Sequence, residues 1–461
     1  LEAIRSESKT AVRLEQKAAW QGVRTALDGE RDTAVELLKA VPNGMESAEA
    51  LASLTDPIRR DVHVAVRRLL HATAGEVSEP RTALRRWLEV QQTRCGRLFG
   101  GQLHAAGEFD ALEVAPVEPE FDQEEEVDGR IVLRENFKAL FEKHPELLTF
   151  GEDTGRIGGV NQSMEGMQEA FGKDRVADTG IRECTIMGQG IGLAMRGLRP
   201  IAEIQYLDYL YYALQIMRDD LATVHYRSAG TQRAPLIVRT RGHRLEGIWH
   251  AGSPMGAIVH SLRGMHVCVP RNMTEAAGMY NTLMSAGEPA LVVECLNGYR
   301  SKERLPSNLG EFKVPLGIPE VVRKGSDLTV VSYGSTFNLC VQAAKTLSEL
   351  DVDVELIDVR TLLPFDLNGT IANSVSRTHR VLFVDEDVPG GASAYMMERS
   401  LATGELWQHL DAAPETLSAA PHLPAYGTDG DYFSKPSNED IVEKAYAMVA
   451  EGDPSSYPDL I

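Results

Sequence analysis

The sequence has little cysteine and no long hydrophobic run. No uninterrupted apolar stretch reaches the ~18 residues of a membrane span, and no signal peptide opens the chain. The five cysteines are odd in number and scattered, with no C-x-x-C pair: Cys95, Cys184, Cys268, Cys295 and Cys340. This pattern is typical of a reducing compartment and argues against a disulfide framework or a zinc site. We therefore expect a soluble, cytoplasmic protein.

Positive charge is also scarce. The chain has 47 Lys and Arg residues against 67 Asp and Glu residues, a net charge of −20. Nucleic acids and anionic membranes both require clustered positive charge, so neither is expected as a partner. The hydrophobic content of 43% and the charged content of 25% are ordinary for globular proteins and exclude extensive disorder. At ~150 residues per domain, a chain of 461 residues predicts two to four domains.

Several catalytic motifs are missing as well. There is no H-E-x-x-H or comparable ligand cluster, so we expect no metal-binding residues in this chain. There is no G-x-S-x-G, which argues against a serine hydrolase. The glycines of Gly188–Gly192 match a dinucleotide fingerprint weakly, and the acidic end of a second strand is lacking, which argues against a nicotinamide-dependent dehydrogenase.

The first 116 residues are predicted to form a helical extension. Residues 1–26 carry an apolar stripe at helical spacing but have no N-cap before them, as if the chain continued a helix from upstream of Leu1. Turns are expected at Pro42-Asn43-Gly44 and at Glu79-Pro80, and no strand is expected before residue 130. Residues 117–130 form an acidic linker, with seven acidic residues between Val117 and Gly129. We expect this linker to be extended and solvated.

From Ile131 onward, helical and strand-like patterns alternate. Leu133, Phe137, Leu140 and Phe141 recur at helical spacing, and buried strands are expected at residues 147–150, 200–204, 235–240, 266–270 and 290–294. A glycine- and proline-bearing stretch near residue 320 divides this α/β domain, residues 131–318, from a second one, residues 319–461. The second domain has strand patterns at 327–334, 352–359 and 380–386, and an apolar helix face from Leu339 to Leu350. Continuous apolar strands between helices predict parallel sheets covered on both faces.

Candidate site residues follow the ends of these strands, where ligands of open α/β sheets bind. Three segments stand out: residues 151–160, with Glu152, residues 178–200, with Glu183, and residues 239–256, with His243 and His250. Each signal is weak alone, because a single glutamate at a helix start or a single buried histidine is usually structural. We interpret His225 and His266, which have apolar surroundings, as structural.

In order along the chain, these segments resemble the beta subunit of thiamine-diphosphate-dependent 2-oxo acid dehydrogenases. These are the decarboxylating components of the pyruvate and branched-chain complexes. The resemblance covers residues 131–450 and rests on the following segments: Gly151–Asp153, Phe171–Glu183, Gly197–Tyr209, His250, Pro289–Glu294, Leu356–Asp366 and Val384–Gly391. It implies an α/β fold with a pyrimidine-binding domain followed by a transketolase-type C-terminal domain.

The resemblance assigns roles to four residues. Glu183 matches the glutamate that binds the ring nitrogen of the cofactor's aminopyrimidine, and Tyr209 matches an aromatic residue that stacks on that ring. Glu152 matches a second carboxylate of the site, and His250 matches a histidine that faces the substrate during acyl transfer to a lipoyl group. His243 could assist His250, whereas Arg244 is more simply explained as a surface residue.

One element of the family is missing. The diphosphate and Mg²⁺ of the cofactor are bound by a G-D-G motif with a downstream Asn on the alpha subunit, and the nearest string here, at Gly427–Asp431, lacks the strand-to-helix setting. The resemblance therefore implies an alpha half as partner, together with a lipoyl acyltransferase component. A homodimer through the α/β domains is expected as well, because residues 356–366 and the helix face from Leu339 to Leu350 carry more apolar surface than one small sheet requires. The helical extension resembles the tail of an alpha subunit, as in a fused alpha–beta chain. Branched-chain 2-oxo acids are slightly preferred over pyruvate as substrates; a transketolase-like enzyme and a non-catalytic scaffold that docks the acyltransferase remain alternatives.

Overall fold

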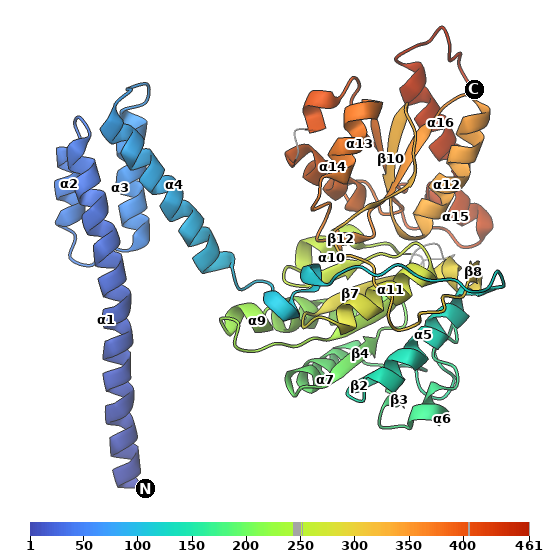
Figure 1. The fold of residues 1–461 in the computed structure, drawn as a ribbon, viewed down its shortest axis with the longest axis horizontal. Helices are drawn as coiled ribbons and strands as arrows, with labels where there is room; N and C mark the ends of the chain where they lie inside the picture. Colours follow the sequence, from blue (N-terminus) through green and yellow to red (C-terminus); the bar gives the residue numbers. More distant parts are fainter. Residues whose placement is uncertain (243–249, 251, 404–405, 461) are drawn as a thin grey trace. The chain divides into compact units, whose positions relative to one another are not determined.

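A computed structural model of the chain describes residues 1–242, 250, 252–403 and 406–460. The chain divides into two compact units, residues 1–101 and 102–461 (Figure 1). In the part of the chain that the structure describes, no helix is both long and apolar enough to cross a membrane.

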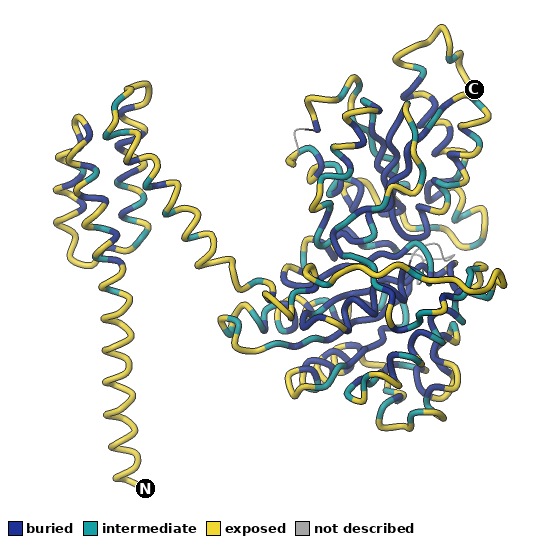
Figure 2. Tube along the Cα trace, in the orientation of Figure 1, coloured by how far each residue is buried: buried dark blue, intermediate teal, exposed yellow. Residues whose placement is uncertain are grey.

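The first unit is entirely helical. It comprises α1 (Glu2–Ala40), α2 (Met45–Ala52), α3 (Arg59–Ala72) and α4 (Glu79–Gly100). The predicted turns separate these helices: Asn43 adopts a positive φ of 60° after α1, and the Ser78 hydroxyl accepts a hydrogen bond from the Arg81 N–H at the start of α4. The buried Glu30 of α1 pairs with Arg59 of α3 at 2.8 Å and with Arg94 of α4 at 2.9 Å. Residues 1–23 of α1 are exposed throughout (Figure 2).

The segment from residue 102 to β1 (Glu126–Asp128) belongs to the second unit, and one expectation about it was wrong. It contains a strand before residue 130, because β1 pairs antiparallel with β8 (Lys302–Arg304). The acidic linker is extended but is not a free connector, because the backbone of Val117 pairs with Lys313 and that of Glu120 with Ser307. The linker's acidic side chains meet basic ones here: Asp128 lies 2.8 Å from Lys302, and Glu124 lies 3.0 Å from Arg304.

A seven-stranded sheet forms the core of the first α/β part, in the order β12-β6-β7-β5-β4-β2-β3. Its strands are β2 (Leu147–Gly151), β3 (Val176–Asp178), β4 (Arg199–Glu203), β5 (Ile237–Gly242), β6 (His266–Cys268), β7 (Ala290–Cys295) and β12 (Thr361–Leu363). All neighbouring strands are parallel except β12, which runs antiparallel to β6. The predicted strands are thus confirmed, within a few residues at their ends.

Helices cover both faces of this sheet. One face packs on α5 (Gly129–Lys143) and α11 (Met273–Met284), and the predicted apolar side chains of α5 are all buried there. The other face packs on α7 (Glu183–Met195), α8 (Tyr211–Ile216) and α10 (Met255–Ser261). The short helices α6 (Met167–Phe171) and α9 (Val224–Arg227) complete this part, with a π-helical turn at Met217–Leu221 and 3-10 turns at Gly107–Phe109, Ala111–Glu113, Leu207–Leu210 and Leu296–Arg300.

The C-terminal part has a five-stranded sheet in the order β14-β13-β10-β11-β9. It comprises β9 (Glu320–Arg323), β10 (Leu328–Ser332), α12 (Gly334–Glu349), β11 (Val354–Asp358), α13 (Thr370–Thr378), β13 (Val381–Val384), α14 (Ala392–Ala402), a 3-10 turn (Leu406–His409), β14 (Glu415–Leu417), α15 (Thr428–Ser434) and α16 (Asn438–Ala450). Its core strands are parallel and fully buried, and only β9 is antiparallel. The apolar face of α12 packs against α16, so it is not the free surface that the sequence suggested for dimerisation.

Candidate active site

Four neighbouring strands bring the four predicted residues to one edge of the seven-stranded sheet. In the strand order β5-β4-β2-β3, His250 follows β5, Tyr209 follows β4, Glu152 follows β2 and Glu183 follows β3. Because the carboxyl ends of parallel strands meet at the same edge, residues that are up to 98 positions apart in the sequence, 152 to 250, converge there.

Glu183 is the first residue of α7. The residue is 8% exposed, at the positive end of the helix dipole. Its carboxylate has no hydrogen-bond partner among the described residues, which leaves its oxygens able to accept a hydrogen bond from outside the chain.

Glu152 lies close to the negative charges of Glu183 and of two further acidic residues. Burial raises the pKa of the Glu152 carboxyl, and the negative charges of Glu183, Asp153 and Glu203 raise it further. Burial also raises the pKa of the Tyr209 phenol, with smaller contributions from Tyr206 and from the charges of Glu152 and Glu183. These mutual effects show that the two carboxylates and Tyr209 share one acidic site.

His250 is held by aromatic and backbone contacts. The Tyr209 hydroxyl lies 2.8 Å from Nε2 of His250, and the ring of Tyr206 packs 4.5 Å from the His250 ring, centre to centre. The Asp208 carboxylate accepts the backbone N–H of Gly252 at 3.2 Å, two residues beyond His250. Burial raises the pKa of Asp208, and the Gly252 N–H partly offsets that effect. The segment from Tyr206 to Tyr209 therefore positions the imidazole.

The loop that carries Glu152 is fixed by backbone hydrogen bonds. The Asp178 carboxylate accepts the N–H groups of Gly155 at 2.7 Å and Arg156 at 3.0 Å. Gly158 adopts a φ of +77°, and a Cβ there would lie only 2.3 Å from the backbone nitrogen of Glu165. Only glycine fits this turn.

A fully buried cluster of charges lies below the same loop. Arg239 of β5 pairs with Glu203 of β4 at 2.5 Å and with Glu294 of β7 at 2.7 Å, and Arg241 pairs with Glu203 at 2.9 Å. All four side chains have zero exposure. A Cβ on Gly159 would lie 3.1 Å from Nη2 of Arg241, so this cluster supports the Glu152 loop directly.

The C-terminal part also contributes to the site. Ser253 donates a hydrogen bond to Glu386 at 2.6 Å, and the Gly256 N–H donates to Asp387 at 2.8 Å. Both carboxylates belong to the run after β13, and both partners lie just beyond His250. The segment that carries the histidine is therefore anchored to both α/β parts.

Two of the sequence-based interpretations lie outside the described residues: His243 and Arg244. Sequence reasoning did not single out Tyr206, Asp208, Glu386 or Asp387. These four residues could have been found from the sequence, because they lie within two motifs at strand ends, residues 197–209 and 384–391. The string Gly427–Asp431 begins at α15 after an irregular segment, so it has no strand-to-helix setting.

Comparisons with known proteins cover the α/β parts. Residues 125–301 match the family model "Transketolase, pyrimidine binding domain", and residues 317–433 match "Transketolase, C-terminal domain". The pyruvate dehydrogenase E1 component subunit beta of Staphylococcus epidermidis is 32% identical, over 69% of this chain and 97% of its own length. The 2-oxoisovalerate dehydrogenase subunit beta of Bacillus subtilis is also 32% identical, over 68% and 95% respectively.

A solved structure has the same fold. A split-gene transketolase, described as an inactive beta4 tetramer, superposes with a TM-score of 0.57 over 70% of this chain and 99% of its own, at 17% identity. The expected fold class, a pyrimidine-binding α/β domain followed by a transketolase-type C-terminal domain, is thereby confirmed.

Proposed function

Because the chain belongs to the family of E1 beta subunits of 2-oxo acid dehydrogenases, we propose that it is the beta half of an enzyme that uses thiamine diphosphate to decarboxylate a 2-oxo acid. The observation that carries this proposal is the convergence of Glu152, Glu183, Tyr209 and His250 at one sheet edge.

The side chains at this edge fit the cofactor's aminopyrimidine. Glu183 has a buried carboxylate without a partner among the described residues, which matches a ring nitrogen that donates a hydrogen bond. Tyr209 offers an aromatic face beside it, and stacking requires only a flat π surface. When bound, thiamine diphosphate supplies the carbon nucleophile that attacks the 2-oxo acid.

Each residue then has a separate task. Glu183 holds a proton at the ring nitrogen through its carboxylate oxygen and so sets the protonation state of the pyrimidine. Glu152, with its raised pKa, can keep a proton or pass it on within the acidic site. His250, oriented by the Tyr209 hydroxyl, donates a proton or a hydrogen bond to the substrate during acyl transfer.

The diphosphate and Mg²⁺ belong to a partner in this proposal. The sequence has no G-D-G motif with its downstream Asn, and apolar side chains are exposed beside the site: Ile181 is 79% exposed and Ile157 is 50% exposed. These side chains would be covered by an alpha half that brings the diphosphate site, and their burial would exclude water from the reacting groups. The helical extension is then the tail of such an alpha half, fused to the beta half through the 102–128 segment.

The proposal also specifies the acceptor of the acyl group and the identity of the 2-oxo acid. We assign the acyl group to a lipoyl domain of an acyltransferase component, and we favour branched-chain 2-oxo acids over pyruvate. Both types of relative are 32% identical to this chain, so identity alone does not choose between them.

Reconstitution tests this function. The chain is mixed with an alpha subunit that carries the G-D-G motif, with thiamine diphosphate and Mg²⁺, and 2-oxo acid consumption is followed with an artificial electron acceptor. Turnover is expected only when both halves are present, and faster with 2-oxoisovalerate than with pyruvate. Absence of turnover with every 2-oxo acid, in a stable complex of the two halves, would favour the non-catalytic scaffold; turnover of sugar phosphates instead would favour a transketolase.

A further inference from the structure

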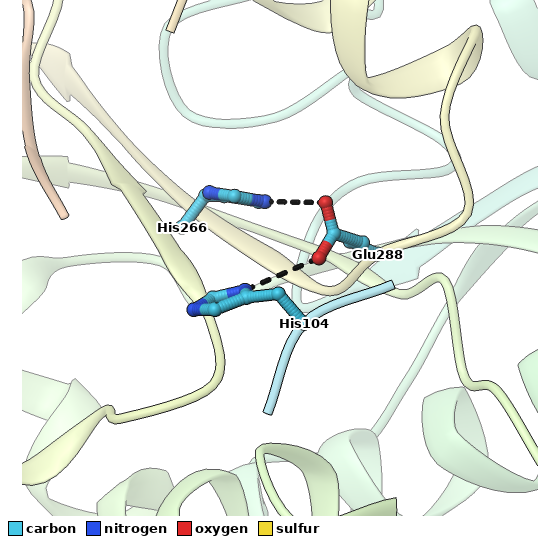
Figure 3. A group of neighbouring side chains, drawn as sticks. All are labelled: His104, His266 and Glu288. Carbon is cyan, nitrogen blue, oxygen red and sulfur yellow. Dashed lines mark hydrogen bonds and ion pairs between the residues drawn. The ribbon is translucent and has the colours of Figure 1, made fainter. Parts of the chain in front are cut away.

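A second cluster of chemistry-bearing side chains lies away from the candidate active site. His104 from the 102–128 segment, His266 at the start of β6 and Glu288 just before β7 point toward one another (Figure 3). His266 and Glu288 precede or begin their strands, so the cluster lies at the amino ends of β6 and β7, whereas the active-site residues follow the carboxyl ends of their strands.

We propose that His104, His266 and Glu288 form a binding site for one transition-metal dication of the zinc type. Their ligand atoms lie within 4.8 Å of one another: Nδ1 of His104 is 3.1 Å from Oε1 of Glu288, and Nε2 of His266 is 2.8 Å from Oε2. Ligand atoms at ~2.0–2.2 Å from a tetrahedral metal are themselves ~3.3 Å apart. The two contacts to Glu288 would therefore change by only a few tenths of an ångström, whereas ligand atoms that lie up to 4.8 Å apart would have to approach by up to about 1.5 Å.

The carboxylate is already oriented for this role. The backbone N–H of Ala105 donates to Oε1 at 2.9 Å, and that of Ala111 donates to Oε2 at 2.8 Å. Such outer hydrogen bonds are what fix the ligands of a metal centre.

The cluster is accessible to solvent. The His104 side chain is 41% exposed, whereas His266 is 1% and Glu288 is 3% exposed, so the cluster opens to solvent on one side only. Nδ1 of His266 is buried without a partner among the described residues, so the polar contacts of that ring depend on Nε2.

The ligand set selects the class of metal. Two imidazoles and one carboxylate suit Zn²⁺, Co²⁺ or Ni²⁺, whereas Mg²⁺ and Ca²⁺ prefer oxygen ligands only. The ion would fasten the 102–111 segment to the start of β6 and to the loop before β7. Its role is structural and independent of the proposed catalysis.

Metal binding by the full chain, first stripped with a chelator, tests the site. Zn²⁺ is titrated calorimetrically and Co²⁺ by its visible absorption. The variant His104→Asn keeps an N–H near Glu288 but cannot act as an imidazole ligand, and His422→Ala, at an exposed histidine elsewhere, is the matched control. We expect one ion per chain at this site, an affinity at least ~10-fold weaker in His104→Asn, and no change in His422→Ala.

Thermal unfolding distinguishes a metal site from a purely hydrogen-bonded clamp. The metal-free wild type and His104→Asn should unfold at similar temperatures, and Zn²⁺ should stabilise the wild type far more than the variant. Equal Zn²⁺ affinity and equal stabilisation in the two proteins would overturn the proposal, as would the absence of Zn²⁺ binding to the wild type at millimolar concentration.

Discussion

At the scale of single residues, the acidic character of the candidate site explains why its groups do not behave as isolated side chains. Glu152 lies near Glu183, Asp153 and Glu203, and protonation of Glu152 relieves the repulsion from all three. His250, by contrast, has a hydrogen-bond partner at Nε2, the hydroxyl of Tyr209. Proton storage and substrate contact are therefore assigned to different groups.

The raised pKa of Glu152 predicts a pH-dependent gain in stability for Glu152→Gln. A carboxyl whose pKa is higher in the folded state stabilises the fold while it is protonated, and this contribution is lost as the pH rises through the folded-state pKa. The neutral amide avoids this loss. Glu152→Gln should therefore unfold at a higher temperature than the wild type at pH 8, with a smaller difference at pH 5. A difference that grows toward low pH would contradict the assignment.

His250→Ala separates two steps of the proposed reaction. The histidine is assigned to acyl transfer, so the variant, together with an alpha half, should retain cofactor binding and some decarboxylation with an artificial electron acceptor. Acylation of a lipoyl domain should fall at least ~10²-fold. Equal losses in both assays would place His250 in the decarboxylation step instead.

At the scale of elements, the order of the strands in the sheet determines which side chains meet at the site. The register of β4, β5 and β7 also places Glu203, Arg239, Arg241 and Glu294 in a cluster without exposed surface. A charge inside such a cluster is tolerated only while its partner is present.

Glu203→Gln is therefore predicted to destabilise the protein by about 3–5 kcal/mol, because it leaves Arg239 and Arg241 with less compensating charge. Urea unfolding measures this loss, and Glu169→Gln, at an exposed position of α6, is the matched control with an expected change near zero. A loss below ~1 kcal/mol would show that the buried cluster relaxes or admits water.

The elements also show what the sequence could predict. Buried parallel strands could be predicted because they appear in the sequence as continuous apolar runs. The helical spacing in α5 also predicted its buried face, which contains Leu133, Phe137, Leu140 and Phe141. The strand β1 was missed because two of its three residues are acidic and none is buried, and it forms through pairing with β8. Pairings of distant segments, such as Asp208 with Gly252 or His104 with Glu288, depend on tertiary contacts that leave no local pattern.

At the scale of the whole molecule, the proposal requires assembly. The α12 face is covered within the chain by α16, but the segment before and within α15 exposes large apolar side chains: Leu423 is 75% exposed, Tyr426 is 80% exposed and Phe433 is 76% exposed. Large apolar side chains exposed in one segment point to an interaction surface, and two-fold dimers are the commonest homo-oligomers.

Light scattering on this chain alone should accordingly give the mass of a dimer or an even multiple at micromolar concentration. Phe433→Glu should shift that assembly toward monomer, because it places a charge within the apolar surface. A monomeric wild type would show that dimerisation depends on the alpha half, and an unchanged oligomer in Phe433→Glu would locate the contact elsewhere.

In the proposed function, Glu183 controls the protonation of the cofactor's aminopyrimidine. The measurement that tests it most directly is 2-oxo acid decarboxylation by the reconstituted alpha–beta assembly, with Glu183→Gln compared with the matched control Glu169→Gln. We predict that Glu183→Gln folds normally and loses at least ~10²-fold in turnover, because an amide cannot take the place of a carboxylate in proton transfer, while the control keeps wild-type turnover. Near-normal turnover of Glu183→Gln in that assembly would contradict the account.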